Sequence, residues 1–387
     1  MITFEHVTKQ FPDGTIGVDD LNLEIADGSF TVFVGPSGCG KTTSMRMINR
    51  MIDPTDGVIT VGGEDIRTVR PTRLRLGIGY VIQNAGLMPH RTVVDNVATV
   101  LVLQGTPKRK ARIAALEAME RVGLDLKMAT RYPAQLSGGQ QQRVGVARAL
   151  AADPPILLMD EPFSAVDPVV RDDLQREMLR LQSELKKTIV FVTHDIDEAV
   201  RLGDRVAVFG TGGVLQQIDT PENVLTRPAN DFVTGLVGRD RGFRAMSFHP
   251  AAGLPVLDVE TVALGDVENL PTLPAGAWVL AVDDARRPLG WVNATRQTLA
   301  AQHGAAALAP LGSLTTPERT LRQSLDAVLS SPSEQGVVVD DGGRLLGVVT
   351  APDVLAALAR QKDAAGDDVV LRDAPVAPAD ATQDALS

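Results

Sequence analysis

Residues 35–43 combine glycines, a lysine and hydroxyl side chains at the spacing of a phosphate-binding loop. Glycines let successive backbone N–H groups face a polyphosphate, and the N-terminus of a following helix adds about half a positive charge. Lys41 is expected to reach the β and γ phosphates, and the Thr42 hydroxyl to bind magnesium. For this stretch alone, a chance glycine-rich turn is the alternative. The residues concerned are Gly35, Pro36, Ser37, Gly38, Cys39, Gly40, Lys41, Thr42 and Thr43.

Acidic and imidazole side chains follow two later apolar runs. Asp160 and Glu161 come after residues 156–159, and His194 comes after residues 189–193. Continuous apolar runs of this length are typical of buried parallel strands, and open α/β sheets bind ligands at strand carboxyl ends. We expect Asp160 to bind magnesium, Glu161 to orient and polarise a water molecule, and His194 to contact the γ phosphate. If isolated, each has an ordinary alternative as a solvated polar residue.

A second anion-binding turn precedes the helical stretch 141–148. Ser137, Gly138, Gly139 and Gln140 stand at its start, where free N–H groups and the helix dipole favour an anion. Near the other end of the chain, Phe11 follows a first strand. That ring has two interpretations: stacking on adenine, or packing in the core.

The sequence also predicts the elements that position these side chains. The run before the loop, 31–34, reads as a buried strand, and the run 79–82 delivers Gln83 to a strand end. The charged stretch 108–112 is expected to be a solvated helix face. In chain order we expect strands at 21–25, 31–34, 79–82, 156–159 and 189–193, a hairpin at 57–66 with its turn at 62–63, and helices at 43–51, 92–126 and 141–148.

Composition narrows the class of protein. A length of 387 residues favours two domains, and a net charge of -10 argues against a general nucleic-acid binder. The single cysteine, Cys39, permits no intramolecular disulfide, which favours a reducing compartment. There is no signal-peptide pattern, and no apolar run is long enough to span a bilayer. At a membrane, the chain is expected to act as a peripheral subunit.

Taken together, these pieces resemble the ATP-binding cassette family over residues 1–240. The order is Phe11, the phosphate loop, Gln83, Leu-Ser-Gly-Gly-Gln at 136–140, Asp160-Glu161, Ser164-Ala165-Val166-Asp167 and His194. The resemblance implies an α/β fold: a P-loop NTPase cassette with a RecA-like core, an antiparallel β subdomain and a helical subdomain. It departs mildly at Val166, where leucine is commoner.

The same resemblance assigns further roles. It implies a head-to-tail homodimer, in which Ser137, Gly138, Gly139, Gln140 and Asp167 of one copy close over ATP and Mg²⁺ held by the other. It implies that Phe11 stacks on adenine. It also makes Gln83 a catalytic and metal contact that joins the nucleotide to the helical subdomain, which in this family docks on a membrane permease.

A repeat follows residue 240, at a constant offset of 57 residues, as from Val282 to Val339. Each copy predicts strand, turn, strand and helix, with one shared core. Residues 241–360 resemble a smaller α+β pair of cystathionine-β-synthase-type (CBS) modules, with copies at about 248–300 and 308–360. The resemblance implies a nucleotide near Thr350 and Asp353. In the first copy Asn293 and Arg296 stand at those positions, and arginine cannot accept a hydroxyl proton.

The alternative for this region is a packing or dimerising domain without a ligand. The first copy is interrupted by prolines before Trp278, where an ordinary module needs an unbroken helix. Trp278 and Trp291 lie within apolar runs and are expected in the core rather than in an aromatic cage. Residues 361–387 read as a disordered acidic tail.

Cassette and repeats together resemble the ATPase subunits of quaternary amine uptake transporters, for glycine betaine, carnitine, choline or proline. Supporting stretches lie at 47–54, 86–90, 219–225 and 228–232. This resemblance implies a permease, an extracytoplasmic solute-binding protein and a place on the cytoplasmic face of the membrane. Two alternatives stay open: an importer for another small solute, and a cassette ATPase acting on ribosomes or DNA. One cassette without sustained heptads argues against the second.

Overall fold

The computed structural model describes residues 1–83, 85–164 and 166–366. The chain divides into two compact units, Met1–Gly242 and a second that begins at Phe243. The division falls two residues later than the sequence predicts. The helix α11 (Arg241–Ala245) spans it, so the stretch 239–242 is not simply a linker.

The first unit is built on a six-stranded sheet in the order β10-β9-β3-β8-β7-β6. All neighbours are parallel except β10 and β9. The central strands are buried along their whole length, which explains their unbroken apolar sequences. The strands are β3 (Phe30–Val34), β6 (Ile78–Val81), β7 (Ile156–Asp160), β8 (Thr188–Thr193), β9 (Arg205–Phe209) and β10 (Leu215–Asp219).

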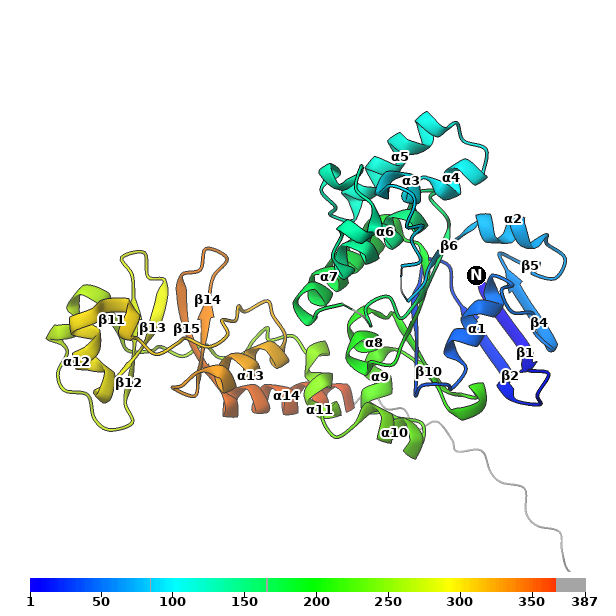
Figure 1. Ribbon diagram of the computed structural model, residues 1–387. Helices are drawn as coiled ribbons and strands as arrows, with labels where there is room; N and C mark the ends of the chain where they lie inside the picture. Colours follow the sequence, from blue (N-terminus) through cyan, green and yellow to red (C-terminus); the bar gives the residue numbers. More distant parts are fainter. Residues whose placement is uncertain (84, 165, 367–387) are drawn as a thin grey trace, which may run out of the picture. The chain divides into compact units, whose positions relative to one another are not determined.

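Helices cover this sheet (Figure 1). Helix α1 packs on β7 and β8, and α8 packs on β3. Asp195 and Thr220 cap α8 and α9 by accepting backbone N–H groups. The helices around the sheet are α1 (Lys41–Ile48), α7 (Pro168–Leu185), α8 (Ile196–Leu202), α9 (Pro221–Thr226) and α10 (Asp231–Val237).

A second sheet in the same unit is antiparallel, in the order β2-β1-β4-β5. Its hairpin between β4 and β5 turns at Gly62 and Gly63, both with positive φ, as predicted. One hydrophobic core joins this sheet to the parallel one. Its strands are β1 (Ile2–Gln10), β2 (Ile16–Ile25), β4 (Asp56–Val61) and β5 (Glu64–Asp65), and α2 (Pro71–Leu76) follows.

A helical part completes the first unit, as Figure 1 shows in cyan and green. The predicted helical stretch 92–126 is broken, because Gly105 adopts φ 90° and Pro107 precedes the next helix. The helices are α3 (Val93–Val97), α4 (Thr99–Leu103), α5 (Lys108–Arg121) and α6 (Gly138–Leu150). The face 108–112 is mostly exposed, but Arg112 also binds Asp95 of α3 at 2.7 Å.

The second unit repeats one motif at the predicted offset. Three consecutive elements of the first copy start 57 residues before their counterparts: β12 at Trp278 and β14 at Gln335, β13 at Pro288 and β15 at Leu345, α12 at Ala294 and α14 at Ala351. The remaining elements are β11 (Thr261–Ala263), β12 (Trp278–Val282), β13 (Pro288–Asn293), α12 (Ala294–His303), α13 (Leu321–Ser330), β14 (Gln335–Val339), β15 (Leu345–Thr350) and α14 (Ala351–Gly366).

The two copies share one core, as the sequence predicts. Leu280 and Trp291 of the first pack with Val337, Val339 and Val348 of the second. Trp291 is fully buried and Trp278 is partly buried against it.

The two copies differ ahead of their paired strands. The second copy has the helix α13, capped by Thr320, whereas the first has only the 3₁₀ turn 264–269. The predicted tail is corrected at its start, because residues 361–366 belong to α14. Residues 367–387 lie outside the described residues.

Candidate functional site

The parallel register brings the predicted site residues to one edge of the sheet. Val34 pairs with Thr193, and Asp160 pairs with Val192. The chain therefore leaves β3, β7 and β8 at the same edge, where the phosphate loop, the acid pair and His194 follow. Residues separated by more than a hundred positions thus share one site.

Close backbone approaches require the glycines of the phosphate loop. Gly35 has φ 154°, and a Cβ there would lie 2.3 Å from the Phe209 carbonyl oxygen. Gly40 has φ 99° and caps α1, and its Cβ would lie 2.3 Å from the Gly17 carbonyl oxygen. The helix spans Lys41–Ile48, so it begins two residues and ends three residues earlier than predicted. Lys41 and Thr42 therefore stand in its first turn.

Lys41 is buried, with 5% of its surface exposed. Its ammonium donates to the carbonyl oxygens of Gly35 at 2.7 Å and Pro36 at 2.8 Å, and lies 3.6 Å from the buried Cys39 sulfur. A buried cation inside a curled loop suits a polyanion. Pro36, Ser37 and Gly38 are exposed beside it.

The side chains expected to bind magnesium lie together. Thr42 Oγ1 donates to Asp160 Oδ1 at 2.8 Å, and Asp160 is buried. Hydroxyl and carboxylate oxygens are ligands that Mg²⁺ prefers, with phosphate oxygens and water completing the shell. No group of three or more His, Cys, Asp or Glu side chains gathers as a metal site in the described ranges. The residues thus fit a metal bound jointly with a nucleotide.

Glu161 is the centre of a second cluster. Its backbone has φ 42°, a left-handed conformation that costs a non-glycine residue about 1–2 kcal/mol. Its Oε2 lies 3.3 Å from His194 Nδ1 and accepts a long bond of 3.5 Å from Gln83 Nε2. Gln83 also donates to Ser164 Oγ at 3.3 Å. The structure therefore groups Glu161, His194 and Gln83, while Gln83 as a metal ligand stays a prediction.

Phe11 is linked to the phosphate loop by Gly17, which lies between the Phe11 ring and Gly40. Its half-buried ring packs on Gly17, where a Cβ would come within 2.7 Å of it. Gly17 in turn approaches Gly40, and the Lys9 ammonium lies 5.5 Å from the ring centre. Adenine stacking stays a prediction that this placement favours.

The turn 137–140 forms a reciprocal helix cap. Gln140 N donates to Ser137 Oγ at 3.3 Å, and Ser137 N donates to Gln140 Oε1 at 3.0 Å. Both side chains thus serve their own helix N-terminus. Their role toward the ATP of a second copy, with Gly138, Gly139 and the exposed Asp167, stays a prediction.

Sequence reasoning missed two arginines that support the site. Arg46 Nη2 lies 3.3 Å from Asp160 Oδ2. Arg148 of α6 donates to the carbonyl oxygens of Ala85 at 2.6 Å and Gly86 at 2.8 Å, just after Gln83, and burial lowers the pKa of its guanidinium. Arg46 was recognisable one helical turn after Thr42. Arg148 carried no such signal, because its partners are backbone atoms.

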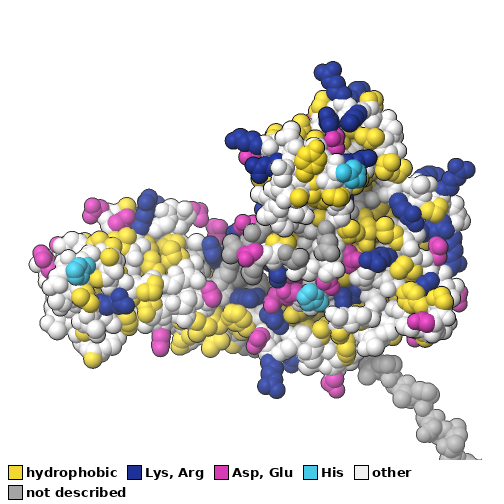
Figure 2. Space-filling model, viewed as in Figure 1, with side chains coloured by type: hydrophobic (Ala, Val, Ile, Leu, Met, Phe, Trp, Pro, Cys, Tyr) yellow, Lys and Arg dark blue, Asp and Glu magenta, His cyan; other side chains and the backbone are white. Residues whose placement is uncertain are grey.

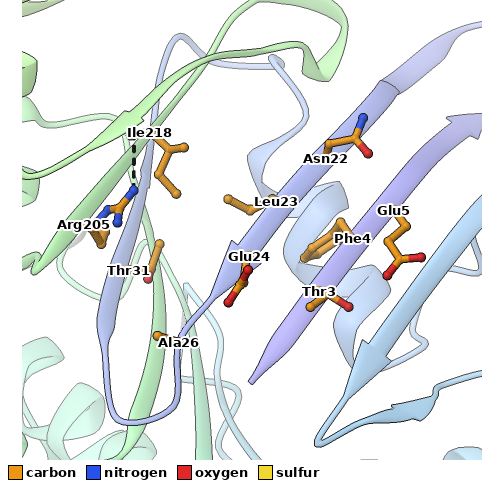
Figure 3. Close-up of a pocket in the computed structure, with 10 residues that line it drawn as sticks. All are labelled: Thr3, Phe4, Glu5, Asn22, Leu23, Glu24, Ala26, Thr31, Arg205 and Ile218. Atoms are coloured by element: carbon orange, nitrogen blue, oxygen red, sulfur yellow. Dashed lines mark hydrogen bonds between the residues drawn. The ribbon is translucent and has the colours of Figure 1, made fainter. Parts of the chain in front are cut away.

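A separate hollow of about 530 Å³ lies between the antiparallel sheet and the parallel one (Figure 3). Thr31, at the beginning of β3, and Arg205, at the beginning of β9, line it. The phosphate loop follows the other end of β3, so this hollow is not the nucleotide site.

In the second unit, the residues at the predicted nucleotide positions lie at the starts of helices α14 and α12. Thr350 Oγ1 donates to Asp353 Oδ2 at 2.6 Å. In the first copy Asn293 caps α12, and Arg296 donates to the Ala307 carbonyl at 2.9 Å. Nucleotide binding near Thr350 stays a prediction.

Surface and helix properties add two observations. Lys and Arg side chains gather at the α5 end of the helical part, despite the net charge of -10 (Figure 2). Within the part of the chain that the structure describes, no helix combines the length and apolar character needed to cross a membrane.

A parallel sheet carrying this loop, acid pair and histidine at one edge, with an antiparallel sheet and a helical part, defines a P-loop NTPase cassette. The family described as ABC transporter matches residues 18–164. A dimeric ATP-binding cassette bound to ADP and Pi is similar, with a TM-score of 0.53 and 33% identity over 57% of this chain and 99% of that one. This likeness confirms the predicted cassette fold.

Curated relatives extend the similarity. An osmoprotectant import ATP-binding protein of Salmonella typhimurium is 39% identical over 90% of this chain and 94% of its own length. The chain belongs to the ATP-binding proteins of the ABC transporter family. A carnitine transport ATP-binding protein of Listeria monocytogenes is 52% identical, and a choline transport ATP-binding protein of Bacillus subtilis 49% identical. They match over 62% and 64% of this chain, which covers 60% and 65% of their lengths.

Proposed function

We propose that this chain is the ATP-hydrolysing subunit of a membrane importer for quaternary ammonium osmoprotectants. One observation carries the hydrolysis: Lys41, Thr42, Asp160, Glu161 and His194 converge at one sheet edge. The solute class is supported by the relatives, which are ATP-binding proteins for the transport of carnitine, choline and osmoprotectants.

The proposed chemistry divides among these residues. Bound magnesium would neutralise phosphate charge, and Thr42 and Asp160 would hold it. Lys41 and the loop N–H groups would bind the β and γ phosphates. Glu161 Oε2 would accept a hydrogen bond from the attacking water, and His194 would fix that carboxylate while reaching the γ phosphate.

A composite site between two copies is part of the proposal. The solved relative is a cassette dimer, and the turn 137–140 presents a helix N-terminus suited to phosphate. Mixing purified Lys41→Ala and Ser137→Arg chains tests this arrangement, because one site of the mixed dimer keeps both functional halves. We expect phosphate release above either variant alone; no gain on mixing would contradict the composite site.

Transport is tested with the whole complex. Proteoliposomes should contain this subunit with its co-purified permease and binding protein, and should be assayed for radiolabelled glycine betaine uptake across a salt series. We expect ATP-dependent uptake that choline and carnitine compete for and maltose does not, with Glu161→Gln as the inactive control. Intact ATP hydrolysis without betaine uptake or competition would reject the solute class and leave the cassette chemistry standing.

A further inference from the structure

A buried acid that the proposed mechanism does not use lies just behind His194. Glu198, on α8, is 7% exposed. Its Oε2 accepts a 2.6 Å hydrogen bond from the Thr193 hydroxyl, and its Oε1 accepts a 3.3 Å bond from Gln175 Nε2. Thr193 and Gln175 are also buried. Three buried polar side chains from β8, α8 and α7 therefore satisfy one another.

One end of this cluster fixes the turn that carries His194. Thr193 immediately precedes His194, and its Oγ1 accepts the Asp195 backbone N–H at 3.0 Å. Thr193 Oγ1 thus bonds both the turn and Glu198. Because the His194 ring extends from this turn to Glu161 at 3.3 Å, a shift of the turn would move that contact.

The other end of the cluster lies at the start of α7, which follows Val166 and Asp167. Arg171 Nη2 donates to the Val166 carbonyl at 3.3 Å, and its Nε lies 4.0 Å from Glu198 Oε1. Gln175 accepts a 3.0 Å bond from Arg201 Nη1, which also binds Asp172. Through Arg171 the cluster therefore reaches Val166, two residues after Ser164, and through Thr193 it reaches the turn with His194.

We propose that Glu198 is a positioning residue that holds the His194 turn against the start of α7, so that the His194–Glu161 contact is formed before ATP is hydrolysed. This inference rests on the proposed function. It differs from a purely structural role because it requires Glu198 to act through His194.

The electrostatics of the pocket fit such a role. Burial raises the pKa of Glu198, and the Thr193 hydroxyl, Arg171 and Gln175 oppose this rise while Asp195 adds to it. A buried carboxyl is costly unless its oxygens are bonded, so these donors constrain where it can sit. The ionisable groups facing it are Asp195 of its own turn and Arg171 of α7.

A double-mutant cycle in the full-length chain tests the proposal. The measurement is phosphate release at saturating ATP and magnesium for Glu198→Leu, His194→Ala and the double variant. We expect Glu198→Leu to lower the rate by about 10-fold in the wild-type background and by less than about 2-fold when His194 is absent, because residues acting through one contact are non-additive. Losses that multiply independently would overturn the proposal.

Conservative variants keep the test decisive if Glu198→Leu fails to fold. Thr193→Val should reproduce the loss, and Thr193→Ser, which retains the hydroxyl, should restore most of the rate. Equal rates for Val and Ser would overturn the proposal. Glu184→Ala is the matched control, because Glu184 lies on α7, which also carries Gln175, but pairs with Arg180 at the surface.

Hydrogen exchange of the nucleotide-free chain supplies a readout apart from activity. In Glu198→Leu, amides at 193–198 and 166–171 should exchange faster than in Glu184→Ala; unchanged exchange in both segments would count against the proposal. A wild-type chain without ATP hydrolysis would remove the proposed function itself. An active wild type with independent losses would remove only the role of Glu198.

Discussion

The edge of the parallel sheet and the hairpin turns of the paired repeats use polar side chains in different ways. At the sheet edge, polar partners come from distant positions, as when Thr42 bonds Asp160 and Gln83 bonds Glu161. In the hairpin turns of the repeats, they bond within one turn: Asp283 Oδ1 accepts from Arg287 N, and Asp340 Oδ1 accepts from Arg344 N, at the same offset of the repeat. The sheet edge brings distant side chains together at the proposed site, whereas these two turns bond locally and shape hairpins.

This difference predicts which property, activity or stability, a substitution in each region should change. The first unit should lose activity when a polar residue at the edge changes. The second should lose stability when its shared apolar core changes, because buried side chains of both copies pack together there.

Trp291 offers the largest stability effect. Replacing this fully buried residue by alanine should destabilise the second unit by about 3–5 kcal/mol, since it leaves a large cavity in the shared core. Urea unfolding followed by hydrogen exchange within residues 243–366 would measure the loss, while ATP binding should persist. Trp291→Phe is the control: among the described residues the indole N–H has no partner, so a phenyl ring should cost far less. A large loss of ATP binding in Trp291→Ala would contradict the expectation that this core affects only the stability of the second unit.

The hairpin turns give a smaller, paired test. Arg286 has φ 59° where the second copy has Gly343 with φ 76°. Glycine adopts this conformation without strain, so Arg286→Gly should stabilise the unit by about 0.5–1 kcal/mol and Gly343→Ala should destabilise it by about 1 kcal/mol. Midpoints of urea unfolding would show the two shifts. Shifts of the same sign would show that the two turns are not equivalent.

The smallest effect concerns pH and the ion pair between α3 and α5. Arg112 donates to both carboxylate oxygens of Asp95, which lowers the pKa of Asp95 below its ordinary 3.8. A lowered pKa contributes stability that is present above the unfolded value and is lost as pH falls through the folded one. Asp95→Asn should therefore lower the midpoint temperature slightly at neutral pH, and this gap should close below pH 3.8. A gap that persists in acid would mean that packing, not charge, makes the difference.

Patterns in the sequence predicted those parts of the structure that depend on residues close together in the chain. They include the phosphate loop, the buried strands and the 57-residue repeat. Each was recognisable because its signal lies in continuous stretches of sequence. The α14 helix extends to 366, where alanine favours a helix, although the sequence predicted a disordered acidic tail from residue 361.

Contacts between distant segments were not predictable in this way. Glu198 bonds Gln175 and Arg148 bonds backbone atoms near Gln83, and neither partner leaves a spacing signal in the sequence. The same holds for Arg112, whose pairing with Asp95 depends on how α3 meets α5. Tertiary placement alone decides these contacts.

The most direct test of the account is phosphate release by the full-length chain and by Glu161→Gln, together with ATP binding by both. Glu161 is the proposed water-orienting residue, and glutamine keeps its size and its bonds while removing its basicity. We expect unchanged ATP binding and hydrolysis slowed by ~10²–10⁴, the range for loss of a general base. Near-normal turnover in Glu161→Gln would contradict the assignment of this sheet edge as a site built around Glu161.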